Sequence, residues 1–443
     1  MAVHFTPDTF RYPLGIWQLK RTLDRTQWLS EAELQAFQDR KAVETVRHAW
    51  EQVPYYRRLF RQAGIVPSDI RAAEHLRRIP ILDKPTLRQD SKQFLAEDAA
   101  RYHPRAFYTS GTTGSPIELY HGKHANMLEF VYYWRYWGWA GYRLGDRFVQ
   151  VASLAFLKDP HLRGRLYKWQ PHLGRLLLNS IEIRPERAEE IAGLVRRYRC
   201  RFLKGLSATL YFLALCTRDA GIGDLAFQAV FGTGEALTPK IRRTLGEVFH
   251  GHVIDSYGHM ERTVGICQCP KGGYHVNADY GLLQVENPHK ENGSTWARII
   301  GTTLHSRAMP LIRYDVGDDV ELFETPPQCP CGRTLPLVKG VRGRREDAVV
   351  TPDGRSLHAF FAIAELVQGA DFIQFLQEST RRIEILVVPN RKWSDTTRLK
   401  LESYVRQAVG PDMTIRTREV AGKRIQRDPS GKIRAVISNV VAP

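Results

Sequence analysis

The sequence has few cysteines, no long apolar run and no repeated or low-complexity segment, and each absence excludes a class of protein. Six cysteines among 443 residues are too few for a disulfide scaffold. No apolar run approaches the roughly 20 residues that span a bilayer, so we expect no membrane span. The N-terminal stretch lacks the apolar core of a signal peptide, which favours a cytoplasmic protein.

Basic residues outnumber acidic ones. The chain has 64 Lys and Arg against 47 Asp and Glu, a formal net charge of +17, which suggests an anionic partner. The arginine clusters at 194–204 and 340–347 lie within patterned segments and form no basic tail. We therefore interpret the excess as a solvated surface that favours phosphorylated small molecules or an acidic carrier protein, without a nucleic-acid partner.

A chain of this length exceeds the size at which one core keeps growing, so two or more domains are expected. Apolar residues at helical spacing, broken by Pro54, predict a helix, a turn and a short helix over 31–64. From 146 to 261, strand-like and helix-like stretches alternate, which predicts a mostly parallel sheet covered by helices. Short strands are expected over 279–322, and a small α+β unit after Arg342.

A loop rich in Ser, Thr and Gly, "YTSGTTGSP" at 108–116, lies between two stretches with strand character. Its N–H groups and hydroxyls can converge on an anion, which suits a polyphosphate. Ser115 and Pro116 stand where a Walker loop has a lysine and a hydroxyl residue, so a Walker site is disfavoured. By itself, the loop could also be a hairpin turn without a ligand.

Four of the six cysteines form two Cys-x-Cys pairs, in "CQCPKGGYH" at 267–275 and "CPCGR" at 329–333. Thiolates and an imidazole suit tetrahedral zinc, and four protein ligands would make the metal structural. Unmetallated buried cysteines are the alternative.

Six motifs follow one another in a fixed order along most of the chain: "YTSGTTGSP" at 108–116, "GTGEALTP" at 232–239, "DSYGHME" at 255–261, "LIRYDVGD" at 311–318, "GRRED" at 343–347 and "DPSGKIR" at 428–434. Together they resemble the adenylate-forming superfamily of acyl-CoA synthetases and adenylation domains. Within it, "VPYYRRLF", "RIPILDKPTL" and "CPCGR" look like the phenylacetate-CoA ligase and capsule-biosynthesis branch.

The resemblance implies an α/β fold in two parts. A large N-terminal domain, 1–345, would combine helix-covered, mostly parallel sheets with a β-rich subdomain and hold the ATP, acyl and zinc sites. A small mobile α+β domain, 346–443, would carry the catalytic lysine and turn on a hinge near Glu346.

The resemblance also implies a reaction. ATP and a carboxylic acid would give an acyl-adenylate and pyrophosphate, and the thiol of coenzyme A would then take the acyl group. An amine or the phosphopantetheine thiol of a carrier protein is the alternative acceptor, in natural-product or polysaccharide assembly. A homodimer is left open. Two other hypotheses are a zinc-containing nucleic-acid-binding protein, motivated by charge and cysteines, and a degenerate member that binds nucleotide without turnover.

The resemblance also implies which residues of the motifs bind the nucleotide. The β- and γ-phosphates would be wrapped by Thr109, Ser110, Gly111, Thr112, Thr113 and Gly114. The adenine and ribose would be held by Gly232, Gly234, Glu235, Tyr257, Gly258, Asp318 and Arg344. Taken singly, Tyr257 could be a core residue, and Asp318 or Arg344 could form a surface ion pair.

Two charged residues would act in catalysis. Lys432 would swing in and stabilise charge on the carboxylate and α-phosphate as the adenylate forms. Glu261 would bind the Mg²⁺ that bridges the phosphates. The alternatives are a solvated lysine and an ordinary loop glutamate. Met260 departs from the family, which has Thr or Ser there, because methionine cannot donate a hydrogen bond to the α-phosphate. The neighbouring His259 could take over a polar role.

For zinc, the resemblance favours Cys269, His275, Cys329 and Cys331, with Cys267 as an alternative ligand. The aromatic stretch at 129–142 would border the acyl pocket, which suits an aromatic or long apolar acid. Which side chains point inward is left open among Tyr132, Tyr133, Tyr136 and Trp137.

Overall fold

The structure is a computed structural model of the chain. It describes residues 12–440, apart from gaps at 109–116, 153–155, 157–158, 163, 236, 292, 343–348, 353–355, 358–362, 365–366, 368 and 427–434.

The N-terminal helices begin at a side-chain cap or at a proline in the first turn. They are α2 (Pro13–Thr26), α3 (Glu31–Gln52), α4 (Pro54–Gln62) and α5 (Lys84–Gln89). Ser30 and Glu33 form a reciprocal capping box at the start of α3. Pro54 cannot continue α3 but suits the first turn of α4, so the helix, turn and short helix predicted over 31–64 are confirmed. Helix α2 was not predicted.

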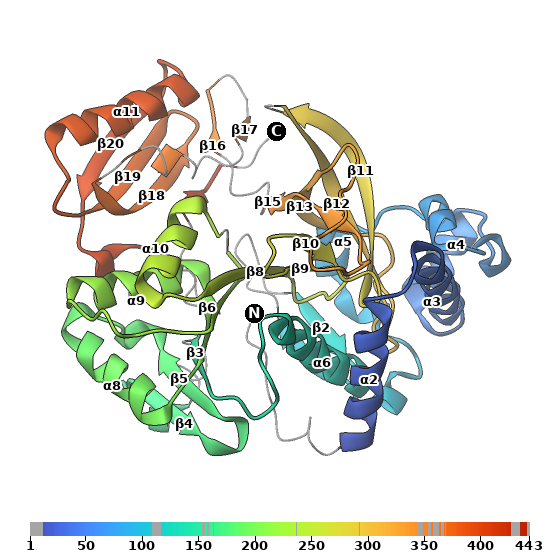
Figure 1. Cartoon of the computed structure of the whole chain (residues 1–443). Helices are drawn as coiled ribbons and strands as arrows, with labels where there is room; N and C mark the ends of the chain where they lie inside the picture. The colour runs from blue at the N-terminus through green and yellow to red at the C-terminus, as the bar shows by residue number, and fades with distance from the viewer. Residues whose placement is uncertain are drawn as a thin grey trace.

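A nine-stranded sheet forms the centre of the larger part (Figure 1), in the order β14-β10-β9-β8-β7-β6-β3-β5-β4. Its strands are β3 (Phe148–Ala152), β4 (Tyr167–Gln170), β5 (Arg175–Asn179), β6 (Phe202–Leu206), β7 (Ala229–Thr233), β8 (His252–Gly258), β9 (Gly265–Gln268), β10 (Tyr274–Val276) and β14 (Leu337–Val338). Strands β5, β3, β6, β7 and β8 pair in parallel. The predicted parallel sheet is confirmed, and its flanks are antiparallel.

Helices cover both faces of this sheet. They are α6 (Lys123–Trp139), α8 (Ala188–Tyr198), α9 (Ser207–Asp219) and α10 (Pro239–Phe249). One apolar core lies between the sheet and α8, α9 and α10, and a second, rich in aromatic rings, joins the other face to α6 and α2. All four aromatic residues left open on α6 are buried, at 3% exposure or less. Burial on both faces explains why these strands read as apolar runs.

A second, antiparallel sheet contains β11 (Gly281–Glu291), β12 (Ser294–Thr303), β13 (Tyr314–Leu322) and β15 (Gly340–Arg342). The β-rich segment predicted over 279–322 is therefore confirmed. A hairpin of β1 (Arg105–Tyr108) and β2 (Glu118–His121) flanks the Ser/Thr/Gly loop, with Tyr108 paired to Glu118. The loop itself lies outside the described residues, but its two ends are held side by side.

The C-terminal unit is a small α+β structure (Figure 1, orange to red). It contains β16 (Val349–Val350), β17 (Ser356–Leu357), β18 (Ala370–Ser379), β19 (Arg382–Pro389), α11 (Asp395–Val409), β20 (Thr414–Glu419) and β21 (Val436–Ser438). It rests on α9 and α10, where Lys240 Nζ donates to the Ala370 carbonyl at 2.7 Å and Ala208 packs with Leu376 and Leu386. The α+β prediction is confirmed. The boundary and hinge predicted at 345–346 lie outside the described residues.

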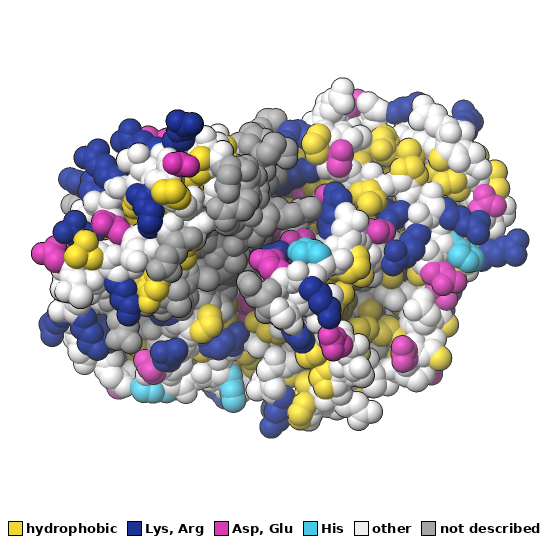
Figure 2. Space-filling model, turned by 90° about the horizontal axis from the view of Figure 1, so that it is seen from above, with side chains coloured by type: hydrophobic (Ala, Val, Ile, Leu, Met, Phe, Trp, Pro, Cys, Tyr) yellow, Lys and Arg dark blue, Asp and Glu magenta, His cyan; other side chains and the backbone are white. Residues whose placement is uncertain are grey.

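Among the described residues, no helix is both long and apolar enough to cross a membrane. On the face shown in Figure 2, Lys and Arg side chains are dispersed among neutral and acidic ones. They do not form a single basic stripe on this face.

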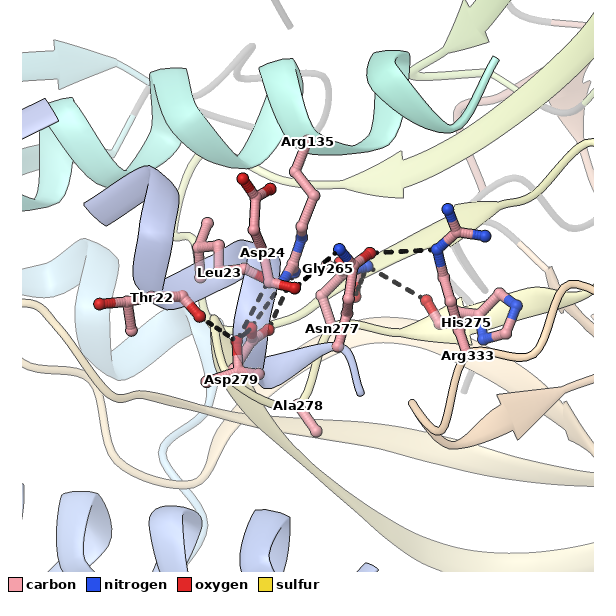
Figure 3. A network of polar contacts seen from close by, with 12 residues as sticks. Thr22, Leu23, Asp24, Arg135, Gly265, His275, Asn277, Ala278, Asp279 and Arg333 are labelled. Carbon is pink, nitrogen blue, oxygen red and sulfur yellow. Dashed lines mark hydrogen bonds and ion pairs between the residues drawn. The ribbon is translucent and has the colours of Figure 1, made fainter. Parts of the chain in front are cut away.

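A buried ion pair joins α6 to the segment that leads into β11 (Figure 3). Arg135 of α6 binds Asp279 through Nη1 at 2.5 Å and Nη2 at 2.9 Å, and both side chains are at most 1% exposed. The guanidinium also donates to the Leu23 carbonyl at 2.8 Å and to Asn277 Oδ1 at 2.6 Å. Thr26 donates a further hydrogen bond to Asp279. Although burial opposes ionisation, Arg135 and Thr26 keep the pKa of Asp279 below its usual value.

We predict that Asp279→Asn lowers the free energy of unfolding by about 3–5 kcal/mol, because it leaves Arg135 buried without its counter-charge. Chemical denaturation would measure the change. Asp224→Asn, at the exposed pair with Arg196, is the matched control and should change stability far less. Equal effects of the two variants would contradict a structural role for the buried pair.

Candidate functional site

Three predicted nucleotide residues lie where β7 ends. Gly234 has φ 72°, a left-handed conformation that favours glycine. Gly232 faces Ser207, whose Oγ would lie 3.0 Å from an added Cβ. The Glu235 carboxylate accepts a hydrogen bond of 2.9 Å from the Ala208 N–H in the first turn of α9. The loop after β7 is thus tied to a helix N-terminus, where negative charge is favoured.

Tyr257 at the end of β8 meets Asp318 of β13, so two further predicted residues from separate sheets come together. The Tyr257 hydroxyl donates to Asp318 Oδ2 at 2.7 Å. Burial and the adjacent Asp318 charge raise the pKa of Tyr257 well above its usual value, so the phenol stays protonated as a donor. Gly258 follows at the end of β8, paired with Gly265.

Glu261 is buried yet ionised. Its Oε1 accepts from the Tyr314 hydroxyl at 2.9 Å, and its Oε2 lies 3.1 Å from His259 Nδ1. Burial alone would raise the pKa of Glu261, but the His259 hydrogen bond and charge outweigh it, and the pKa falls to about 2. Lys84, at the start of α5, lowers it further. A buried carboxylate that stays charged can bind a metal cation.

Both ring nitrogens of His259 are engaged within its own loop. Because a carboxylate only accepts hydrogen bonds, Nδ1 carries the proton toward Glu261, while Nε2 lies 3.2 Å from Thr263 Oγ1. The polar role suggested for His259 is therefore directed to Glu261 in this structure. Thr263 in turn contacts Gly301, where an added Cβ would come within 1.9 Å of its hydroxyl.

Both strands of the β1–β2 hairpin contact the loop of Glu261. The His121 ring of β2 donates through Nε2 to the Met260 carbonyl at 2.8 Å, and burial lowers the pKa of His121 well below its usual value. The Arg262 guanidinium lies 5.1 Å from the centre of the Phe107 ring on β1. The base of the Ser/Thr/Gly loop and the buried carboxylate are thus neighbours.

Several predicted site residues lie outside the described part of the chain: Thr109 to Gly114, Arg344 and Lys432. Their roles stay predictions. Sequence reasoning also missed residues that support the site, namely His259 as the partner of Glu261, with Thr263, Tyr314 and Lys84. The short spacing of the His-Met-Glu sequence was the one available signal, since Tyr314 is 53 residues from Glu261.

The two Cys-x-Cys pairs converge on one histidine. The ligand atoms of Cys269, His275, Cys329 and Cys331 all lie within 4.8 Å of one another. Cys269 and Cys329 have their sulfurs 3.6 Å apart, close to the roughly 3.8 Å expected of two thiolates bound tetrahedrally at about 2.3 Å from zinc. The structure does not bring Cys267 to this group, because its sulfur lies 2.9 Å from the Tyr132 hydroxyl.

His275 is oriented for coordination. Its Nδ1 donates to the Leu335 carbonyl at 3.2 Å, which leaves Nε2 facing Cys331 Sγ at 3.2 Å. Burial lowers the pKa of His275 to about 4, so the ring is neutral at pH 7, as a metal ligand must be. The donor set fits structural zinc.

A pocket of about 470 Å³ opens at the start of α6, beside Gly122 and Lys123. Its other charged lining includes Lys41, Arg101 and Arg307. Acidic neighbours neutralise part of this charge, since Glu44 pairs with Lys41 and Arg307, and Asp98 pairs with Arg101.

Residues 56–294, more than half of the chain, match the family described as AMP-binding enzyme. The chain belongs to the AMP-binding enzyme family. Residues 349–439 match the CapK C-terminal domain. The resemblance to the adenylate-forming superfamily, in its phenylacetate-CoA ligase and CapK-like branch, is thereby confirmed.

Relatives of this AMP-binding enzyme fall into the same branch. Phenylacetate-coenzyme A ligase of Thermus thermophilus is 26% identical over 336 residues, 73% of each chain. Protein CapK of Staphylococcus aureus is 20% identical over 418 residues, 92% of this chain and 90% of CapK. The fold resembles 2-hydroxyisobutyryl-CoA ligase in its postadenylation state, with a TM-score of 0.73, 19% identity and coverage of 94% and 92%. The predicted two-part α/β architecture is confirmed.

We predict that His259→Leu lowers the free energy of unfolding by about 1–3 kcal/mol at pH 7, because it leaves buried Glu261 charged without its main donor. The pKa of Glu261 in the folded protein, about 2, lies below the ordinary 4.5. In the unchanged protein, ionised Glu261 therefore makes its full contribution to the free energy of unfolding above pH 4.5, and this contribution is lost as the pH falls from 4.5 to 2.

In His259→Leu, burial dominates and raises the pKa of Glu261. The loss in free energy of unfolding relative to the unchanged protein should therefore be smaller at pH 5 than at pH 7. Denaturation at both pH values measures this. His252→Leu, at an exposed histidine of β8, is the matched control. A deficit that does not change with pH would contradict the assignment.

Proposed function

We propose that this AMP-binding enzyme activates a carboxylic acid with ATP, forming an acyl-adenylate and pyrophosphate, and then transfers the acyl group to the thiol of coenzyme A. One observation carries the proposal: the base of the Ser/Thr/Gly loop lies against the loop of a buried, ionised glutamate. Such a pairing suits a nucleoside triphosphate, with the loop on its β- and γ-phosphates and Glu261 on Mg²⁺.

In this proposal, Glu261 holds the cation and the other loop residues hold Glu261. A Mg²⁺ ion held there would neutralise charge on the phosphates and on the leaving pyrophosphate. His259 and Tyr314 orient the carboxylate and keep it charged, which is the form a cation needs. The Met260 side chain has no donor for the α-phosphate, and its carbonyl accepts a hydrogen bond from His121. We therefore assign the stabilisation of charge on the α-phosphate to Lys432.

The nucleoside would lie between β7, β8 and β13. Tyr257 offers a ring beside the loop of Gly232 to Glu235, and Asp318 offers a carboxylate for the ribose hydroxyls. The hydrogen bond between Tyr257 and Asp318 keeps both groups in place before ATP arrives, so these side chains lose less conformational freedom on binding. Arg344 is proposed as a further ribose contact.

The acceptor could also be an amine or a carrier-protein thiol. This second candidate is kept because the C-terminal unit matches the CapK C-terminal domain and the alignment with CapK is the longer one, and CapK is not named for coenzyme A. The adenylation half-reaction is the same in both cases, so the two candidates differ only after the acyl-adenylate has formed. The fold and family speak against the nucleic-acid alternative.

We predict that acid-dependent exchange of pyrophosphate into ATP occurs without coenzyme A and falls at least about 100-fold in Lys432→Ala, because a transition-state charge loses its partner. Lys392→Ala, at an exposed lysine of the same unit, is the matched control and should keep the exchange. Release of coenzyme A thioester, or of an amide, from supplied acyl-adenylate then identifies the acceptor. Exchange that survives in Lys432→Ala would refute the assignment of this lysine.

We further propose that Cys269, His275, Cys329 and Cys331 bind one structural zinc ion. The convergence of three thiols and one correctly oriented imidazole supports this, as does Gly273, where a Cβ would lie 2.8 Å from Cys329 Sγ. The metal would join β9 and β10 to the segment that precedes β14. A closed set of four ligands leaves no position for a substrate.

We predict one zinc per chain by elemental analysis, and its loss together with a lower melting temperature in Cys331→Ser, because the site ties distant segments together. Cys200→Ser, at a buried cysteine outside the cluster, should retain the metal. Metal-free protein as freshly purified would refute the zinc site.

A further inference from the structure

Lys204 lies in the middle of the central sheet, where no described residue accepts a hydrogen bond from its ammonium group. Its residue is 2% exposed, and its Nζ makes no hydrogen bond to any described residue. It points toward α6, where Nζ lies 4.3 Å from the ring centre of Tyr133 and 4.8 Å from that of Trp137. Aromatic faces attract a cation but offer no acceptor atom of the kind an ammonium group needs.

The charges around Lys204 do not compensate it. Arg175 of β5 adds positive charge and is itself bound to Gln150 at 2.9 Å. Among the described residues, Glu129 of α6 is the counter-charge that raises the pKa of Lys204. The Tyr280 hydroxyl donates to Glu129, however, and the Arg262 guanidinium lies 3.6 Å from its carboxylate. Burial and Arg175 lower the pKa of Lys204 to about 7. An anion beside Nζ would restore the full charge.

The position of Lys204 relates it to the reacting centre. It pairs in register with Phe231 of β7, and Phe231 pairs with Ile254 of β8. Tyr257 lies three residues farther along β8, or about 10 Å at ~3.3 Å per residue. The same face of α6 extends to this end of the strands, because the Tyr136 hydroxyl lies 3.2 Å from Ser256 Oγ. Lys204 therefore lies below the carboxyl ends of the strands, on the side covered by α6.

We propose that Lys204 binds the far end of the acid substrate, and that this acid carries a second carboxylate remote from the one that is activated. The inference rests on the proposed function and adds to it a class of substrate. A buried ammonium is costly when unpaired, and a carboxylate that completes the pair offsets this cost, so an otherwise unexplained lysine becomes a specificity determinant. The aromatic rings beside it suit an aryl or alkyl spacer between the two carboxylates.

The test compares matched pairs of acids in the pyrophosphate exchange assay. Phenylacetate is compared with 4-carboxyphenylacetate, and hexanoate with adipate, so that each pair differs by the remote carboxylate. We expect the unchanged protein to prefer the dicarboxylic member by at least about tenfold in kcat/KM, and Lys204→Met to reduce this preference at least about tenfold. Lys168→Met, at an exposed lysine of β4 in the same sheet, should keep the preference.

Thermal unfolding separates recognition from structure. Because Met removes an unpaired buried charge, Lys204→Met should melt at the same temperature as the unchanged protein or higher. Lys204→Gln is the second variant, with a donor but no charge, and should show the same loss of preference. A preference for the apolar acids that both variants leave unchanged would overturn the role of Lys204 while keeping the proposed function. No exchange with any of the four acids would overturn both.

Discussion

The buried pair of Arg135 and Asp279 is the interaction on which the arrangement of the larger part depends. It joins α6 to the turn before β11 (Figure 3), and through Leu23 and Thr26 it also fixes α2. Asn277 extends the network, because it accepts from Arg135 and donates to the His275 carbonyl at 3.2 Å beside the cysteine cluster. A charged pair this deep is tolerated because several hydrogen bonds satisfy it, and it favours one packing of α6 over alternatives that would leave a charge unpaired.

The position of α6 in turn determines the surroundings of the candidate site. The helix starts directly after β2, whose His121 binds the Met260 carbonyl, and its aromatic face covers β6, β7 and β8. The loop of Glu261 is thus held from three sides, by the hairpin, by Tyr314 of the second sheet and by its own His259. This support keeps a carboxylate ionised where burial alone would neutralise it, and the same enclosure leaves Lys204 beside aromatic rings with no hydrogen-bond partner among the described residues.

Much of the architecture could be predicted from the sequence, because its signals are local. Strands buried on both faces appear as short apolar runs, and the capping box at Ser30 and the proline at 54 mark helix ends without reference to the fold. Helix α2 gave a weaker signal, since three of its 14 residues are buried. The candidate nucleotide and zinc residues were found through motifs, and the structure brings Tyr257 to Asp318 and both Cys-x-Cys pairs to His275.

The sequence by itself determined the order of elements, the family motifs and the kinds of donor atom available, since these depend on neighbours along the chain. Only the tertiary structure decided which donors meet. Tyr314 reaches Glu261 across 53 residues, and Arg135 reaches Asp279 across 144, with no pattern that links them in sequence. It also separated Cys267 from the cluster formed by its neighbour Cys269. Residues two apart on one strand would face the same side, but β9 ends at Gln268, so Cys269 lies beyond the strand and reaches Cys329, while Cys267 stays in the strand beside Tyr132. Charge pairing and burial depend on distance in space, and folding alone sets that distance.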